Sequence, residues 1–233
     1  MDSLAVVNRM LAEHSGRDKT LRTLYYGLMF VSDRMRNRLL AESVQRLSKD
    51  LSLSRLVLRQ LNDLPQWLSC LKHFSVDPRT VVDAVSHNLS GLVTVLYTFY
   101  CPVEHVAWLS SHKVLSANPD RWFRYCLYIW LCALCCGILK SIRTYARLTR
   151  EVGRLRLDDD RKQEHRRLSE QLTDEALVLV AHLSDFMNAI NYLPQGILWS
   201  QTFPQWKVAI FGFIASAAGW WRLFRAAKRS LNA

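Results

Sequence analysis

The sequence predicts an all-α protein, a helical integral membrane protein with amphipathic helices and about two transmembrane helices. Three observations lead to this fold class. Half of the 233 residues are hydrophobic, which excludes a chain that is intrinsically disordered throughout. Eight Gly and six Pro are few for a turn-rich β-sandwich, and no alternating strand pattern of convincing length occurs. The mean hydropathy of −0.03 is typical of a soluble chain, yet the apolar residues are segregated into runs.

Residues 1–121 are predicted to form a region of amphipathic helices. Its first apolar stripe recurs at helical spacing and consists of Leu21, Leu24, Tyr25, Leu28, Val31 and Met35. Basic residues surround this stripe, among them Arg17, Lys19 and Arg22. Such a helix can lie on an anionic membrane with its apolar face among the headgroups. The alternative is a bundle helix with a solvated basic face, and the pattern alone favours that alternative.

Two further stretches of this region follow the same helical spacing. One comprises Leu40, Val44, Leu47, Leu51, Leu58 and Leu61, and Pro65 is expected to end its helix. The other is residues 84–103, which carry no formal charge, and its helix face comprises Val82, Val85, Leu89, Leu92, Leu96 and Phe99. Residues 186–206 are also uncharged but contain several Asn and Gln residues. For 84–103 and 186–206, packing in a bundle is favoured over membrane insertion.

Residues 122–140 are predicted to form the first transmembrane helix. The run 125–139 has no formal charge, and its extension to Trp122 adds one charged residue, Arg124. At about 1.5 Å rise per residue, these 18 residues nearly cross a hydrocarbon core of about 30 Å. Arg124 lies at the edge, where a long side chain can reach the headgroups. A buried core helix is the alternative.

Residues 206–223 are predicted to form the second transmembrane helix. Its uncharged part, 208–221, is short, and basic residues flank it on both sides. Small residues at Gly212, Ala215, Ser216 and Gly219 are placed to permit close helix–helix packing in the membrane. Between the spans, residues 141–170 are expected to be a charged linker and 171–205 an amphipathic helical region, and 224–233 form a basic tail.

The formal charge of +11 requires an anionic partner to be considered. The basic residues are spread over amphipathic helices without a recognisable nucleic-acid-binding module, so an anionic phospholipid membrane is favoured over nucleic acid. No catalytic or phosphate-binding motif is found, so neither an enzyme nor a cofactor is expected. The spacing of Cys101, Glu104, His105 and His112 matches no usual zinc pattern, and no metal site is expected.

Three groups of residues carry a resemblance to a known family. The first is Gly16, Arg17, Asp18, Lys19, Arg22 and Tyr25. The second is the run 100–108, with Glu104, His105 and Trp108, followed by Val114, Leu115, Arg121 and Trp122. The third comprises Asp185, Asn188, Ala189, Leu193, Pro194, Gly196, Leu198 and Trp199. Together they resemble the peroxin-11 family of peroxisomal membrane proteins, and in particular its gamma type, from about Gly16 to Trp221.

This resemblance implies an integral protein of the peroxisomal membrane that promotes membrane elongation and peroxisome proliferation and division. It implies partners as well: the same chain as a homo-oligomer, other peroxin-11 family members, a fission adaptor and a dynamin-related GTPase. The membrane-remodelling helix would be the segment from Arg17 to about Arg38, through Arg17, Lys19, Leu21, Arg22, Leu24, Tyr25, Leu28 and Val31.

The orientation and two other functions are left open by the sequence. The resemblance implies that both termini lie in the cytosol, while basic residues on both sides of 122–140 leave the charge rule undecided. A metabolite channel or transporter of the peroxisomal membrane is the main alternative, although the predicted spans offer few polar groups for a pore. A soluble basic helical adaptor is the third possibility.

Overall fold

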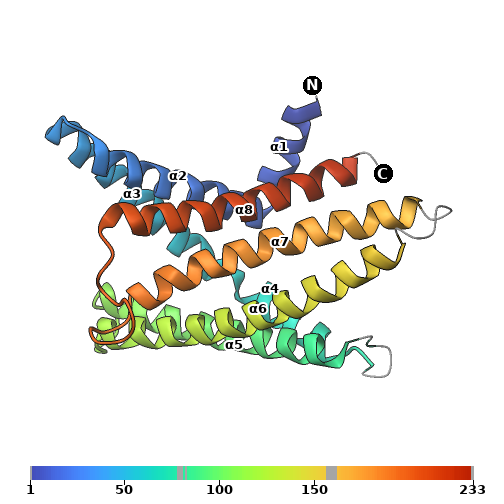
Figure 1. Cartoon of the computed structure of the whole chain (residues 1–233). Coiled ribbons are helices and arrows are strands. Elements are labelled where there is room, and N and C mark those ends of the chain that lie inside the picture. Colours follow the sequence, from blue (N-terminus) through green and yellow to red (C-terminus); the bar gives the residue numbers. More distant parts are fainter. Residues whose placement is uncertain (1, 78–80, 82, 156–161, 232–233) are drawn as a thin grey trace. The chain divides into compact units, whose positions relative to one another are not determined.

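The computed structural model describes residues 2–77, 81, 83–155 and 162–231, and every regular element in these ranges is helical. In chain order the elements are α1 (Asp2–Ala12), α2 (His14–Arg34), α3 (Arg38–Arg59), the 3-10 helix η1 (Gln60–Asn62), α4 (Asp63–Phe74), α5 (Ala84–Ser111), α6 (Pro119–Leu155), α7 (Lys162–Asn191) and α8 (Gln205–Leu231) (Figure 1). The predicted all-α fold class is confirmed. The chain divides into two compact units, which are described separately.

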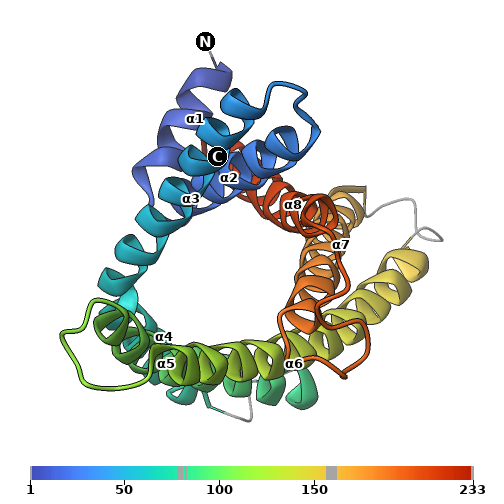
Figure 2. The same ribbon diagram turned by 90° about the vertical axis from the view of Figure 1, so that its left-hand side faces the viewer.

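Unit 1 combines the two ends of the chain, Met1–Arg59 and Leu183–Ala233. Its central helix is α2, which packs against both α3 and α8, while α1 packs against α2 and α8 (Figure 2). The turn from α2 to α3 begins at Met35, whose backbone is extended. Asn37 then begins α3, because its side-chain oxygen accepts a hydrogen bond from the Leu40 amide at 3.2 Å.

The core of unit 1 gathers around two adjacent tyrosines of α2. Tyr25 and Tyr26 are buried together with Val208 of α8, and Met29, Leu51 and Phe203 pack against them. The connection from α7 to α8 is fixed by hydrogen bonds rather than by regular structure. Asn191 accepts from the Phe203 amide through its side chain and from the Gln201 amide through its carbonyl, both at 2.9 Å.

Unit 2 comprises Gln60–His182, and its main feature is an antiparallel hairpin of α5 and α6 (Figure 1). Residues 112–118 join the two helices at one end. At the other end, Asp83 caps α5 by accepting from the Ser86 amide at 3.3 Å. Arg143 of α6 donates through Nε to both carboxylate oxygens of Asp83, at 3.0 and 2.9 Å, and so ties the open end together.

The helices long and apolar enough to cross a membrane are α5 and α6, by length and composition, among the residues that the structure describes. The predicted number of about two such helices is therefore confirmed. The first predicted span, 122–140, lies inside α6, as expected. The second predicted span, 206–223, lies in α8, which is not long and apolar enough to count as a candidate membrane span. The second candidate span is α5 instead. Residues 84–103, for which bundle packing was favoured, thus belong to an apolar helix of spanning length.

One predicted helix boundary is wrong. Pro65 does not end the helix before it, since α3 ends at Arg59 and Pro65 lies in the first turn of α4, where its missing N–H is no loss. Within the segment 141–170, predicted to be a charged linker, α6 continues through Gly153 to Leu155 and α7 begins at Lys162. Residues 156–161 of that linker, and Val82 of the predicted helix face, lie outside the described residues.

Candidate functional site

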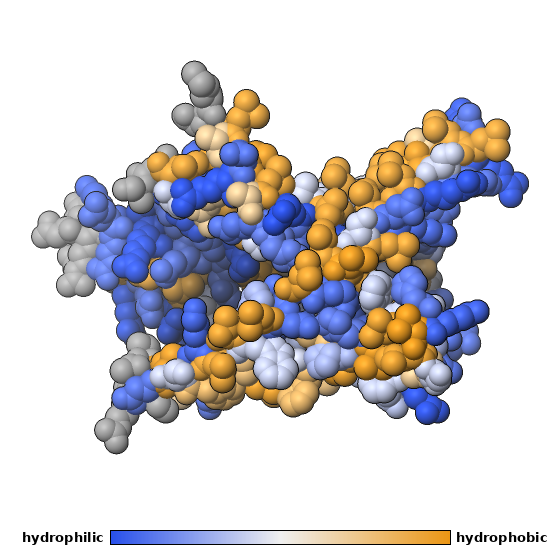
Figure 3. Space-filling model, turned by 180° about the vertical axis from the view of Figure 1, so that it is seen from behind, coloured by the Kyte–Doolittle hydropathy of each residue, from blue (hydrophilic) through white to orange (hydrophobic). Residues whose placement is uncertain are grey.

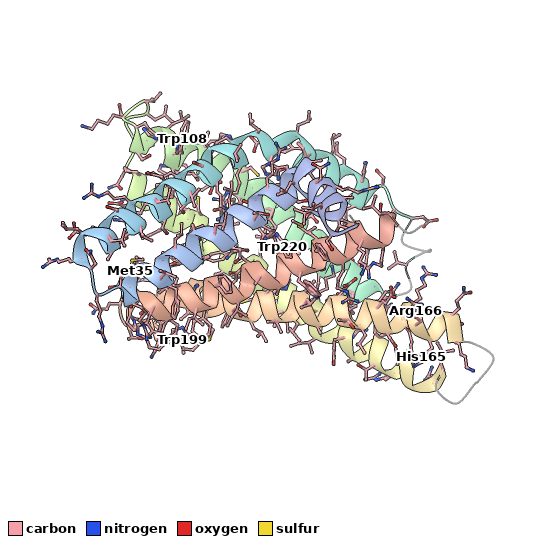
Figure 4. All side chains as sticks on the ribbon, turned by 90° about the horizontal axis from the view of Figure 1, so that it is seen from above. Met35, Trp108, His165, Arg166, Trp199 and Trp220 are labelled. Atoms are coloured by element: carbon pink, nitrogen blue, oxygen red, sulfur yellow. The ribbon has the colours of Figure 1, made fainter. Side chains whose placement is uncertain are left out.

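Two of the small residues predicted to permit helix packing in the membrane, Gly212 and Gly219 of α8, lie against α2 of the same chain. A Cβ atom on Gly212 would overlap the ring of Tyr26, and one on Gly219 would lie 3.4 Å from the Lys19 side chain. Ala215 and Ser216 of the same helix are buried. Trp220 Nε1 donates to Thr20 Oγ1 at 3.1 Å, and Figure 4 shows Trp220 between α8 and α2. This close approach is what the small residues permit.

Two ion pairs are buried beside this interface. Arg22 of α2 binds the Asp185 carboxylate of α7 with both terminal nitrogens, the Nη1–Oδ2 distance being 3.1 Å, and both side chains are only 11% exposed. Arg55 of α3 binds Asp18 of α2, with Nε and Nη2 each 2.9 Å from Oδ1. Hydrogen bonds between an arginine and a carboxylate are stronger than those between neutral groups, because both partners are charged.

The tyrosine rings lie under the two arginines. The Arg22 guanidinium carbon is 5.6 Å from the centre of the Tyr26 ring, and that of Arg55 is 5.5 Å from the centre of the Tyr25 ring. Both distances permit cation–π attraction. Burial and the neighbouring Tyr26 raise the pKa of Tyr25 above its ordinary value, so that its hydroxyl stays neutral at physiological pH. The cluster of Asp18, Lys19, Arg22, Arg55 and Asp185 is called the ionic core below.

Lys19 gives the ionic core one more cation than anions. Burial, followed by the charge of Arg22, lowers the pKa of Lys19 to about 8, and the attraction of Asp18 and Asp185 offsets this only in part. For Asp18, burial opposes ionisation, but the charges of Arg55 and Lys19 and the hydrogen bond from Arg55 leave its pKa below the ordinary value. The lowered pKa of Asp18 keeps its carboxylate ionised at pH 7, and a pKa of about 8 leaves most Lys19 side chains protonated there.

Replacing Lys19 with methionine is expected to reduce the increase in the free energy of unfolding that occurs above about pH 8. In the wild-type chain, unfolded Lys19 holds its proton up to about pH 10.4 while folded Lys19 loses it near 8. Stability therefore rises with pH between about 8 and 10.4, by at most about 3 kcal/mol from this residue. Methionine keeps the apolar stem against Gly219 and removes the proton. Unfolding free energies of both proteins from pH 7 to 10 give the comparison, and an unchanged slope would contradict it.

The predicted membrane-remodelling residues of α2 divide between two faces. Tyr25, Arg22 and Lys19 point into unit 1, as described above. Leu21, Leu24, Leu28 and Val31 follow three- and four-residue spacing and share the opposite face. Leu24 is 52% exposed and Val31 45% exposed, while Leu21 and Leu28 are half-buried and Arg17 is exposed. These four apolar residues are called the outward stripe below.

Several residues of the ionic core were not assigned a site role from the sequence. Asp185, known from the sequence only as a motif residue, is the partner of Arg22. Asn188, one turn further along α7, is almost fully buried and donates to the Val208 carbonyl of α8 at 3.0 Å. Arg55 carries a signal in the sequence, because it is a charge between Leu51 and Leu58 of an otherwise apolar stripe.

The motif residues of α5 form contacts within that helix and with α4 in unit 2. Glu104 is buried and accepts a hydrogen bond from Tyr100 at 2.8 Å. His105 Nε2 lies 3.3 Å from Asp63 Oδ2 of α4, and its Nδ1 lies 2.7 Å from the Cys101 carbonyl. Within the described ranges, no group of three or more His, Cys, Asp or Glu side chains could hold a metal ion.

Comparisons with known proteins agree with the family resemblance that the motif residues carry. A family model described as Peroxisomal biogenesis factor 11 (PEX11) matches residues 4–224. The chain is 29% identical to Peroxisomal membrane protein 11C of Homo sapiens over 239 residues, covering 97% of this chain and 96% of the relative. It is 28% identical to Peroxisomal membrane protein 11C of Mus musculus, covering 97% of this chain and 98% of the relative. No solved structure matches the chain.

Proposed function

Because the chain belongs to the peroxisomal biogenesis factor 11 family, a family of peroxisomal membrane proteins, we propose that it promotes membrane elongation and the proliferation and division of peroxisomes. It does so as an integral membrane protein without catalysing a reaction. The observation that carries the proposal is the outward stripe of α2 on a chain whose match to the family extends over residues 4–224.

The mechanism is insertion of the outward stripe into one leaflet of the membrane. Leu24 and Val31 are exposed on unit 1, so they can enter the boundary between headgroups and acyl chains without unfolding it. Arg17, exposed at the start of α2, attracts anionic headgroups with roughly 1 kcal/mol per charge. The inserted side chains expand one leaflet and favour curvature. The ionic core keeps α2 rigid behind the stripe.

The partners follow from the same proposal. One helix expands a leaflet only slightly, so the chain acts as a homo-oligomer and together with other family members, which adds many weak insertions. A fission adaptor and a dynamin-related GTPase then act on the elongated membrane. Both termini face the cytosol, where α2 meets the cytosolic leaflet and these partners.

Replacing Leu24 and Val31 with glutamate is expected to abolish peroxisome elongation. The two charges prevent the outward stripe from entering the leaflet, while neither side chain belongs to the core of unit 1. The measurement is the length of peroxisomes in cells that express the double variant. The matched control replaces both residues with methionine, which keeps the stripe apolar and should elongate peroxisomes like the wild type. Normal elongation by the glutamate variant would exclude this stripe as the remodelling surface.

A further inference from the structure

α8 is bound to the most charged part of unit 1. It contacts α2 along much of its length, from Gly212 against Tyr26 to Trp220 against Thr20. The Lys19 side chain packs on Gly219, and Arg22 and Asp18 follow on the same stretch of α2. Ionised side chains are costly in hydrocarbon. A transmembrane α8 would therefore either draw the ionic core into the bilayer or lose its packing against α2.

The hairpin of unit 2 has the opposite character. Only 11% of the apolar stretch of α5 and 28% of that of α6 are buried within the protein. On α5, Val85, Leu92 and Phe99 recur every seven residues and are 49%, 48% and 63% exposed. Hydrophobic side chains also lie uncovered on the face of the molecule that Figure 3 shows. A soluble protein seldom leaves so much apolar surface uncovered.

Charged residues mark both ends of this hairpin. The Asp83–Arg143 ion pair lies at its open end, and Lys113 and Arg121 lie at or next to the 112–118 turn. From Arg121 to Arg143, α6 is about 33 Å long, and the 28 residues of α5 extend about 42 Å. A hydrocarbon core is about 30 Å thick. Both helices are therefore long enough to cross it between the two sets of charges.

The ionisable groups between these ends are placed where they can be tolerated. Glu104 is shielded inside the protein with Tyr100 as a hydrogen-bond donor. Arg124 is exposed one turn from the end of α6, within reach of the headgroups. Lys140 is one turn from Arg143 at the other end. The middle of α6, from Tyr125 to Leu139, has no formal charge.

We propose that the α5–α6 hairpin is the part of this protein that crosses the membrane, with lipid acyl chains on its outward face, and that α8 stays outside the hydrocarbon core as a helix of unit 1. The inference depends on the proposed function only for the location in the peroxisomal membrane. It places the 112–118 turn across the membrane from both termini. The 192–204 connection then lies on the same side as the termini, whereas spans by α6 and α8 would reverse these two positions.

Single cysteines at these two positions distinguish the topologies. In a chain whose six native cysteines are replaced, Ser116→Cys reports the 112–118 turn, Gln195→Cys the 192–204 connection and Ser230→Cys the C-terminal helix end. Intact peroxisomes are treated with a membrane-impermeant maleimide before and after detergent. The expected result is that Gln195→Cys and Ser230→Cys are labelled in intact organelles. Ser116→Cys should be labelled only after detergent is added. The proposal is overturned if Ser116→Cys is labelled in intact organelles and Gln195→Cys only after detergent. It is also overturned if all three cysteines are labelled in intact organelles.

A second measurement keeps all native cysteines. Leu92→Arg with Phe99→Arg places charges on the outward face of α5, and Phe213→Arg with Ile214→Arg places them on the exposed side of α8. Alkaline carbonate is expected to extract the α5 variant and to leave the α8 variant in the membrane pellet. Extraction of the α8 variant alone would overturn the proposal. Elongation by each retained variant is scored separately, so a failure of the remodelling function remains distinguishable from a failure of this topology.

Discussion

Replacing Arg22 with alanine is expected to cost unit 1 about 3–5 kcal/mol, because it leaves the Asp185 carboxylate buried without its partner. A loss of this size is a large fraction of the stability of an ordinary domain. The variant should unfold at a much lower temperature in detergent and should be depleted from peroxisomes. Thermal unfolding and the steady-state amount of protein measure the two effects.

The controls separate the ion pair from charge in general. Arg17→Ala removes an exposed cation from the same helix and should change stability by no more than about 0.5 kcal/mol. Replacing both partners, Arg22→Met with Asp185→Leu, removes the uncompensated charge and should recover much of the loss. Equal effects of Arg22→Ala and Arg17→Ala, or a double variant as unstable as the single, would contradict the burial of this pair.

Gly212→Ala is expected to destabilise the α2–α8 interface by about 1–3 kcal/mol. The new methyl group would overlap the Tyr26 ring, which is itself buried and has no free space to move into. The matched control is Gly153→Ala in α6, where nothing lies within 4 Å of the added Cβ. That substitution should be neutral or should stabilise its helix by up to about 1 kcal/mol.

The measurement is again thermal unfolding of the two purified variants, and oligomeric state provides a second readout. Because Gly212 contacts Tyr26 of the same chain, its substitution should not abolish self-association directly. A Gly212→Ala protein as stable as the wild type but monomeric would show that the small residues pack between chains instead.

The helical fold could be predicted because helix formation depends on local spacing of apolar residues. The apolar run in α6 is also local, and it was found. The stripe of Gly212, Ala215, Ser216 and Gly219 was predicted to pack, but its partner was not, since contact with Tyr26 and Lys19 joins residues nearly 200 positions apart. Sequence spacing holds no information about such a distant neighbour.

The division of α2 between two faces shows the same limit. Lys19 and Arg22 have the composition of a solvated basic face, yet they lie in the ionic core, because Asp185 provides a countercharge and Gly219 provides space. Their role depends on α7 and α8. Leu24 and Val31 were predicted as membrane-contacting residues without such dependence, and their exposure leaves them available for that role.

For α5, the sequence could not determine what covers its apolar face. Residues 84–103 are uncharged and amphipathic, a pattern for which packing in a bundle was favoured but which a membrane helix also fits. Only the arrangement of α4 and α6 reveals how much of the face remains uncovered. Composition therefore identified the helix but not its environment.

The assembly of unit 1 from both ends of the chain has a consequence for biosynthesis. Arg22 meets Asp185 and Thr20 meets Trp220 across 163 and 200 residues, so α2 can pack on α3 early, but its contacts with α7 and α8 form only after those helices have been synthesised. Loop closure over such separations makes folding slow compared with that of a local hairpin. The nascent chain must therefore keep its α2 side chains from aggregating while about four-fifths of the polypeptide is made. A premature stop codon before α8 would accordingly remove the helix that packs along α2 and leave that face of unit 1 uncovered.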